Sequence, residues 1–292
     1  MQSKWVLVLL SLSFLVLAGC DIEEMIDSTQ YKEDFHESYP MKAGGRLYLE
    51  NMNGSIEIAG WDQETADISC TKYAGNESAM KAIKVDIVAS GDSIRIRTVP
   101  PSGRWGNMGA RYVVRVPRRT SLERIESSNG RISVSGLDAA ARLQTSNGSI
   151  EASDISGPVT LRTSNGSVRA ERIRNGLEAR TSNGAIRADL GGPMESGTVR
   201  LTTSNGSVEL SMAEFKTQDA DITTSNGSIT VRLPGSVSAD VKANTSNSSI
   251  TNEFDSAFKG RIEKHSLEGT IGAGGPMLTL TTSNGSIRLL RF

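Results

Sequence analysis

Apolar and polar residues alternate along most of this chain in short runs that Asn-Gly pairs separate. Val159 and Leu161 flank a single polar residue before one such pair, and Val208 and Leu210 do so after another. A period of two places apolar side chains on one face of a β-strand. Asn and Gly suit the turns between strands because both tolerate positive φ. The pattern predicts an all-β protein built from many short strands.

The Asn-Gly turns recur with a nearly constant period. Their asparagines are Asn53, Asn129, Asn147, Asn165, Asn183, Asn205, Asn226, Asn247 and Asn284. From Asn129 onward the spacings are 18, 18, 18, 22, 21, 21 and 37 residues. The flanking residues repeat too, since Leu143–Ile150 and Leu161–Val168 share the order Leu-x-Thr-Ser-Asn-Gly-Ser followed by a β-branched residue. Such self-similarity is typical of repeat architectures.

The repeat favours a β-solenoid, similar to a parallel β-helix, with coils of 18–22 residues and Asn-Gly turns. In a solenoid equivalent residues stack, which explains why they are nearly identical. One predicted ladder holds Thr145, Thr163, Thr181, Thr203, Thr224, Thr245 and Thr282, and a second holds the asparagines from Asn147 onward. Inward-facing Ala152, Ala170 and Ala188 predict closely packed sheets. An antiparallel β meander or sandwich, with a hairpin at each Asn-Gly, is the alternative.

The turn glycines carry a further expectation. We expect positive φ at Gly166 and Gly206, where a β-branched residue would be strained. Ser248 replaces the glycine after Asn247, so this turn must bear strain or have another conformation.

The chain divides into four parts. Residues 1–19 are interpreted as a lipoprotein signal peptide and residues 20–39 as a lipidated cysteine with an acidic tether. Residues 40–125 are expected to form irregular coils and a cap, and residues 126–292 the regular solenoid repeats. The repeats contain an insertion at residues 252–276, which we expect to fold over the open end of the final coil.

The first 20 residues have the three parts of a secretion signal. Lys4 is basic, Trp5 to Leu17 is almost wholly apolar, and small residues precede Cys20. Leu17-Ala18-Gly19-Cys20 resembles the lipobox of bacterial lipoproteins, which implies diacylglycerol on the Cys20 sulfur. Asp21 resembles the inner-membrane retention signal of enterobacterial lipoproteins. We therefore expect a cell-envelope location, at the periplasmic face of the inner membrane in such bacteria and otherwise at the outer membrane or cell surface.

Composition narrows the chemistry. The 32 basic and 33 acidic residues nearly balance, so nothing predicts nucleic-acid binding. If Cys20 is lipidated, Cys70 has no partner and is expected to be a small buried residue. The two histidines, His36 and His265, have no evident catalytic or metal-binding partner in the sequence. We expect no cofactor, no metal and no enzymatic activity.

One charge cluster is a candidate site. Arg115, Arg118, Arg119 and Arg124 are close together in the sequence, and Trp105 is nearby. Such a cluster is a candidate for binding anionic lipid headgroups or envelope polymers. A solvated strand face is the alternative interpretation.

The pattern from Gly45 to Asp62, Gly-x-Leu-x-Leu-x-Asn-x-Asn-Gly-x-Ile-x-Ile-x-Gly-Trp-Asp, is followed by Thr-Ser-Asn-Gly repeats. Together they resemble the bacterial "putative adhesin" family of β-strand-repeat proteins. The resemblance implies binding at the cell surface or envelope and assigns no functional residues. The predicted function is a membrane-anchored lipoprotein that binds or scaffolds an envelope polymer or protein. The alternatives are a carbohydrate-active β-helix enzyme and an accessory of envelope-stress signalling.

Overall fold

The computed structural model describes residues 30–102, 107–192 and 194–292. The compact unit from Tyr31 to Phe292 has two β-sheets, here called sheet A and sheet B, and a short helix, α2 (Glu77–Ala82). Asn76 caps this helix by accepting a hydrogen bond from the Ala79 backbone N–H. In the described part of the chain, no helix has the length and apolar character that a membrane crossing requires.

Sheet A has 12 strands and sheet B has 13. In spatial order, sheet A consists of β1 (Tyr31–Pro40), β4 (Thr65–Ala74), β7 (Met108–Pro117), β3 (Ile56–Trp61), β9 (Ile132–Leu137), β11 (Ile150–Ile155), β13 (Val168–Ile173), β15 (Ile186–Leu190), β17 (Val208–Met212), β19 (Ile229–Leu233), β25 (Ile287–Arg291) and β21 (Ile250–Asn252). Sheet B consists of β22 (Phe258–Ile262), β23 (Ser266–Ile271), β20 (Ala239–Thr245), β24 (Met277–Thr282), β18 (Ala220–Thr223), β16 (Ser196–Thr202), β14 (Asn175–Arg180), β12 (Val159–Thr163), β10 (Ala141–Thr145), β8 (Ser121–Asn129), β2 (Arg46–Asn53), β6 (Ser93–Val99) and β5 (Lys84–Ser90).

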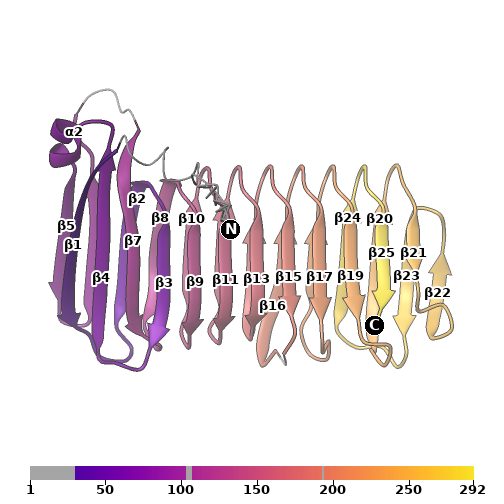
Figure 1. Cartoon of the computed structure of the whole chain (residues 1–292). Helices are drawn as coiled ribbons and strands as arrows, with labels where there is room; N and C mark the ends of the chain where they lie inside the picture. The colour runs from indigo at the N-terminus through magenta and orange to yellow at the C-terminus, as the bar shows by residue number, and fades with distance from the viewer. Residues whose placement is uncertain (1–29, 103–106, 193) are drawn as a thin grey trace, which may run out of the picture. The chain divides into compact units, whose positions relative to one another are not determined.

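Each regular coil contributes one strand to each sheet, and neighbouring coils pair in parallel. Leu143 lies opposite Leu161 in sheet B, and Ala152 lies opposite Ala170 in sheet A. Figure 1 shows the strands of successive coils standing side by side. The parallel pairing confirms the predicted β-solenoid. A wholly antiparallel meander is wrong for these coils, and within the part of the chain that the structure describes antiparallel pairs occur only at the two ends.

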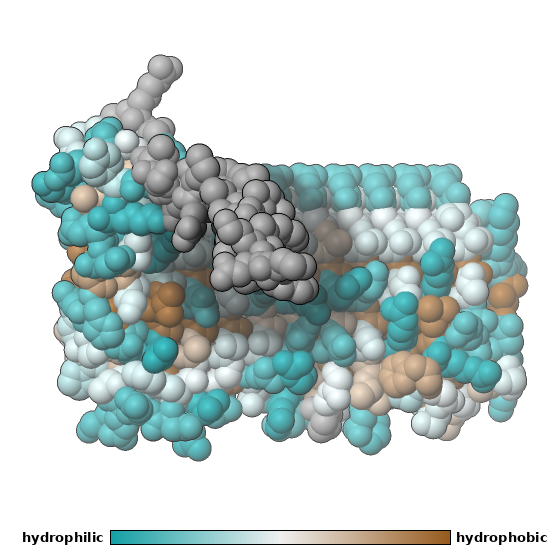
Figure 2. Space-filling view, viewed as in Figure 1, coloured by the Kyte–Doolittle hydropathy of each residue, from teal (hydrophilic) through white to brown (hydrophobic). Residues whose placement is uncertain are grey.

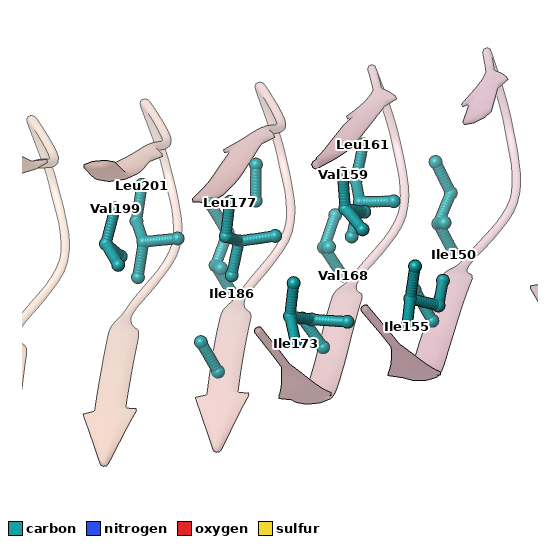
Figure 3. Close-up of a cluster of buried hydrophobic side chains, with 14 of the residues drawn as sticks. Ile150, Ile155, Val159, Leu161, Val168, Ile173, Leu177, Ile186, Val199 and Leu201 are labelled. Carbon is teal, nitrogen blue, oxygen red and sulfur yellow. The ribbon is translucent and has the colours of Figure 1, made fainter. Parts of the chain in front are cut away.

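The core lies between the two sheets. Figure 3 shows side chains such as Leu161, Leu177, Ile150 and Ile186 pointing inward from successive coils. The alanines expected in the early coils are buried as predicted. A fully buried Leu or Ile contributes about 1.5–3 kcal/mol. No single coil can bury its own apolar face, so the stability comes from stacking.

The motif threonines are buried beneath the turns. Each hydroxyl donates a hydrogen bond to a turn glycine carbonyl of the neighbouring coil, as Thr163 Oγ1 does to the Gly148 oxygen at 2.9 Å. The same contact is made by Thr145, Thr181, Thr203, Thr224, Thr245 and Thr282. A buried hydroxyl needs such a partner, so threonine at this position stabilises the stack.

The turn glycines are required by close backbone packing and not by the positive φ that the sequence predicted. Gly166 and Gly206 are absent from the described residues with positive φ, so this part of the sequence prediction is wrong. A Cβ atom at Gly166 would lie 1.8 Å from the carbonyl oxygen of Gly148 in the coil beneath. The same close approach recurs from Gly130 to Gly285. Glycine is needed because the stacked turns leave no room for a side chain.

The order of the coils departs from the order in the sequence. The final coil, β24 and β25, lies between the coil of β18 and β19 and the coil of β20 and β21. The expectation that the insertion at 252–276 covers this coil as the open end is therefore wrong. The insertion instead contains the β22–β23 hairpin, which pairs antiparallel with β20 at the edge of sheet B.

The N-terminal end has the same arrangement. The first coil, β2 and β3, lies between the coil of β6 and β7 and the coil of β8 and β9. The antiparallel strands β1, β4 and β5 cover it from outside. The predicted acidic tether extended to residue 39, but residues 31–40 form β1, the first strand of the compact unit.

A substitution at one turn glycine tests the steric requirement. Gly166→Ala should lower the free energy of unfolding by about 1–3 kcal/mol or more, because the methyl group overpacks against Gly148. Gly235→Ala is the matched control, since nothing lies within 4 Å of its Cβ position. Chemical denaturation of both variants measures the difference. Equal stability would contradict the assignment.

Candidate functional site

The turns that lead from sheet B to sheet A form one continuous edge of the solenoid. Each regular turn exposes a serine followed by an asparagine. In spatial order the pairs are Ser128–Asn129, Ser146–Asn147, Ser164–Asn165, Ser182–Asn183, Ser204–Asn205, Ser225–Asn226, Ser283–Asn284 and Ser246–Asn247, and we call them the Ser–Asn edge. Figure 2 shows this edge as a continuous hydrophilic band along the upper rim, over the regular coils.

The asparagine side chains form a single hydrogen-bonded ladder. The Nδ2 of Asn165 donates to Oδ1 of Asn147 at 2.8 Å, and Asn183 donates to Asn165 in the same way. The ladder continues from Asn53 to Asn247 with bonds of 2.7–2.8 Å. Each amide uses one of its two N–H groups, so every step retains hydrogen-bonding capacity toward solvent.

The serines are not explained by the fold. In the described part of the chain, the hydroxyls of Ser146, Ser164 and Ser182 have no hydrogen-bond partner, whereas the threonines, asparagines and glycines of the same motif all make stacking contacts. Serine nevertheless occupies this exposed position in all eight pairs. The Ser–Asn edge therefore offers rows of free hydroxyl and amide groups, which can form hydrogen bonds to a polar ligand.

The structure separates the four arginines that the sequence groups together. Arg115 lies on the outer face of sheet A, 5.8 Å from the centre of the Trp61 ring, whereas Arg124 lies on sheet B. Arg118 and Arg119 lie in the connection between those strands. Because β7 belongs to sheet A and the next strand, β8, belongs to sheet B, closeness in sequence does not make one patch.

Two of these arginines have acidic partners. Arg118 pairs with Asp62 at 2.7 Å, and Arg124 pairs with Glu126 at 2.8 Å. The pKa of each guanidinium is raised by the hydrogen bond to its carboxylate. Anion binding by the four arginines remains a prediction. Trp105, named with them, lies outside the described residues.

The remaining outer faces carry charges of both signs. Ion pairs between neighbouring coils join Arg131 to Glu151, Arg162 to Glu178, and Arg187 to Glu209. Near the C-terminal ends of β11 and β13, Arg172 donates two hydrogen bonds of 2.6 and 2.8 Å to Asp154, and this contact lowers the pKa of the carboxyl. The paired charges reduce the attraction of these faces for a polyanion.

The structure gives His36 partners that sequence reasoning missed. Its Nε2 lies 2.7 Å from Oδ1 of Asp67, and its Nδ1 lies 3.2 Å from the hydroxyl of Ser69. The strand β4 places Asp67 and Ser69 on one face, directly opposite β1, and their spacing of two residues was the only signal in the sequence. The imidazole is largely exposed on a sheet surface, where these contacts fasten the edge strand β1.

Three other predicted features can be placed. Cys70 is free and buried as expected, and burial raises the pKa of its thiol to about 12. His265 donates a hydrogen bond of 2.5 Å from Nδ1 to the Ser248 backbone oxygen. Among the described residues no group of three His, Cys, Asp or Glu could hold a metal ion. The lipidation site Cys20 lies outside them.

A shallow hollow of about 480 Å³ lies on sheet B across β12, β14 and β16. It forms where Gly176 and Gly197, both at positive φ, leave the strand surface without side chains. Thr160, Glu178 and Arg200 are among the other residues that line it. The hollow is part of the outer face of sheet B and provides no separate chemistry.

Comparison with known proteins identifies a family and solved structures of low similarity. A family model described as Toastrack DUF4097 matches residues 37–221 and 195–290. No curated protein matches the chain.

Two crystal structures are similar to this chain. One is a putative cell adhesion protein from Clostridium sporogenes ATCC 15579, with 13% identity and a TM-score of 0.30, over 89% of this chain and 100% of the other. The second is a putative adhesin from Bacteroides fragilis NCTC 9343, with 11% identity and a TM-score of 0.45, over 88% of this chain and 97% of the other.

Two single substitutions in the same turn test whether the asparagine of the Ser–Asn edge stabilises the fold and the serine does not. Asn165→Ala removes the two ladder bonds to Asn147 and Asn183 and should cost about 1–3 kcal/mol, at about 0.5–1.5 kcal/mol each. Ser164→Ala removes no internal bond and should leave the stability within about 0.5 kcal/mol of the parent. Urea denaturation compares the two. A Ser164→Ala variant as unstable as Asn165→Ala would show that the serine is structural.

Proposed function

The chain belongs to the Toastrack DUF4097 family, and on this basis we propose that it is a non-enzymatic binding or scaffolding protein of the cell envelope, anchored to a membrane through lipid on Cys20. The observation that carries the proposal is the Ser–Asn edge, where serine recurs in all eight pairs and the hydroxyls of Ser146, Ser164 and Ser182 have no partner among the described residues. In this part of the chain these recurring hydroxyls make no contact that stabilises the fold, which supports a role in binding a ligand.

The chemistry of the edge favours an uncharged ligand that is rich in hydroxyl and amide groups. Neutral donors and acceptors repeat once per coil, and neighbouring strands are about 4.7–4.9 Å apart. A linear polymer with many hydroxyl groups, such as an envelope polysaccharide, can contact several coils at once. Each contact is weak, and their combination gives useful affinity.

The proposed anchor places the solenoid close to the membrane. Tyr31, the first residue of β1, follows Cys20 by 11 residues, which span at most about 36–40 Å when fully extended. Two or three acyl chains on the cysteine would hold the protein stably. In a bacterium of enterobacterial type, Asp21 favours the periplasmic face of the inner membrane.

Metabolic labelling with a fatty acid tests the anchor. The parent chain and a Cys70→Ala variant should incorporate label, because Cys70 is buried in the core. Cys20→Ala should incorporate none. Label retained by the Cys20→Ala variant would refute lipidation at this residue.

Binding to isolated envelope polysaccharide tests the Ser–Asn edge. The combined variant Ser146→Ala, Ser164→Ala and Ser182→Ala should bind at least about tenfold more weakly, since three lost bonds of about 0.5 kcal/mol or more correspond to that factor. The matched control is Ser135→Ala, Ser153→Ala and Ser211→Ala, which removes three hydroxyls from the outer face of sheet A. Co-sedimentation measures both. Equal binding by the two variants would exclude the edge as the binding surface.

A further inference from the structure

The final coil of the chain fills a slot between two coils that precede it in the sequence. Strand β24 pairs with β18 on one side and β20 on the other, and β25 pairs with β19 and β21. We propose that this C-terminal coil, residues 277–292, is exchanged between copies of the chain, so that the coil of one copy fills the slot of a second copy.

The contacts that hold the coil all come from residues distant in the sequence. On one wall of the slot, Thr282 Oγ1 donates to the Gly227 carbonyl at 2.9 Å. On the other wall, Thr245 Oγ1 donates to the Gly285 carbonyl at 2.8 Å. None of these bonds depends on the coil and the slot being in the same chain, so a second copy offers the same partners.

The repeat motif fixes the register of an incoming coil. Asn284 donates to Asn226 and accepts from Asn247, each at 2.7 Å, so it occupies one step of the ladder. A Cβ at Gly285 would lie 1.8 Å from the Gly227 oxygen, so the slot admits a glycine there. The slot therefore selects a Thr-Ser-Asn-Gly coil, and the C-terminal coil of a second copy has this sequence.

The coil is joined to the rest of the chain by a short connection that contains glycines. Residues 272–276 link β23 to β24, and Gly272 and Gly274 have φ of 63° and 79°. These glycines allow the chain to reverse direction and enter its own slot. An extended connection of five residues spans about 17 Å, which allows entry into an adjacent molecule. Exchange of an identical element through a hinge of this kind is a low-cost route to a dimer.

Disulfide trapping between differently tagged full-length chains tests the exchange. Thr223 on β18 lies directly opposite Thr281 on β24, at a spacing that a disulfide can bridge. One chain carries Thr223→Cys, and the other carries Thr281→Cys. Co-expressed in one cell and analysed on a denaturing gel, they should give a reductant-sensitive heterodimer.

The control pair is Thr202→Cys with Thr223→Cys, which are opposite each other on β16 and β18, a contact that does not involve the exchanged coil. This pair should give no heterodimer. Deleting Ala273 and Gly274 shortens the connection, hinders entry into the chain's own slot and should raise the heterodimer yield severalfold.

The proposal is overturned if a single chain carrying both Thr223→Cys and Thr281→Cys closes its disulfide while the mixed chains form no heterodimer. It is equally overturned if the control pair gives as much heterodimer as the slot pair, or if the shortened connection leaves the yield unchanged. These readouts do not depend on lipidation or on polymer binding, so the proposed function can fail while the exchange stands.

Discussion

The close contact between the turns of neighbouring coils is the constraint on which the rest of this structure depends. A glycine backbone lies directly against the glycine carbonyl of the coil beneath it, and a buried threonine hydroxyl bonds to the same oxygen. The hydrogen-bond spacing of the sheets fixes the rise per coil. With that rise set, the turn admits no Cβ, the asparagine amides meet at bonding distance, and the inward residues of adjacent coils form one core.

The repeat itself could be predicted because stacking imposes the same residues on every coil. Period-two alternation identified the buried positions, and the recurring Thr and Asn identified the ladders. The role of the glycines was predicted incorrectly because sequence cannot distinguish a positive φ from a close backbone approach. The exposed serines were visible in the repeat, but their lack of internal partners became evident only from the hydrogen bonds.

The spatial order of the coils could not be predicted, because nearly identical motifs carry little information about which neighbour each one contacts. One turn whose sequence departs from the motif does indicate the position of its coil. Ser248, the residue that replaces glycine after Asn247, belongs to the coil of β20 and β21. In sheet A that coil has a neighbour on one side only, which gives its turn more freedom to adjust. Antiparallel strands also lie outside the first coil in both sheets, and the antiparallel β22–β23 hairpin lies outside the last coils in sheet B, so the parallel coils are covered at these edges.

The asparagine ladder has a direction. Every side-chain amide donates toward the N-terminal cap, and the series ends where Asn53 donates to the Met108 carbonyl at 2.9 Å. Bonds aligned head to tail polarise one another and strengthen the series, so the edge has a net dipole along its length. The two ends of the Ser–Asn edge are therefore electrically different. A polymer bound along it would have a lower energy in one orientation than in the reverse, so the solenoid would align a directional strand and not merely hold it.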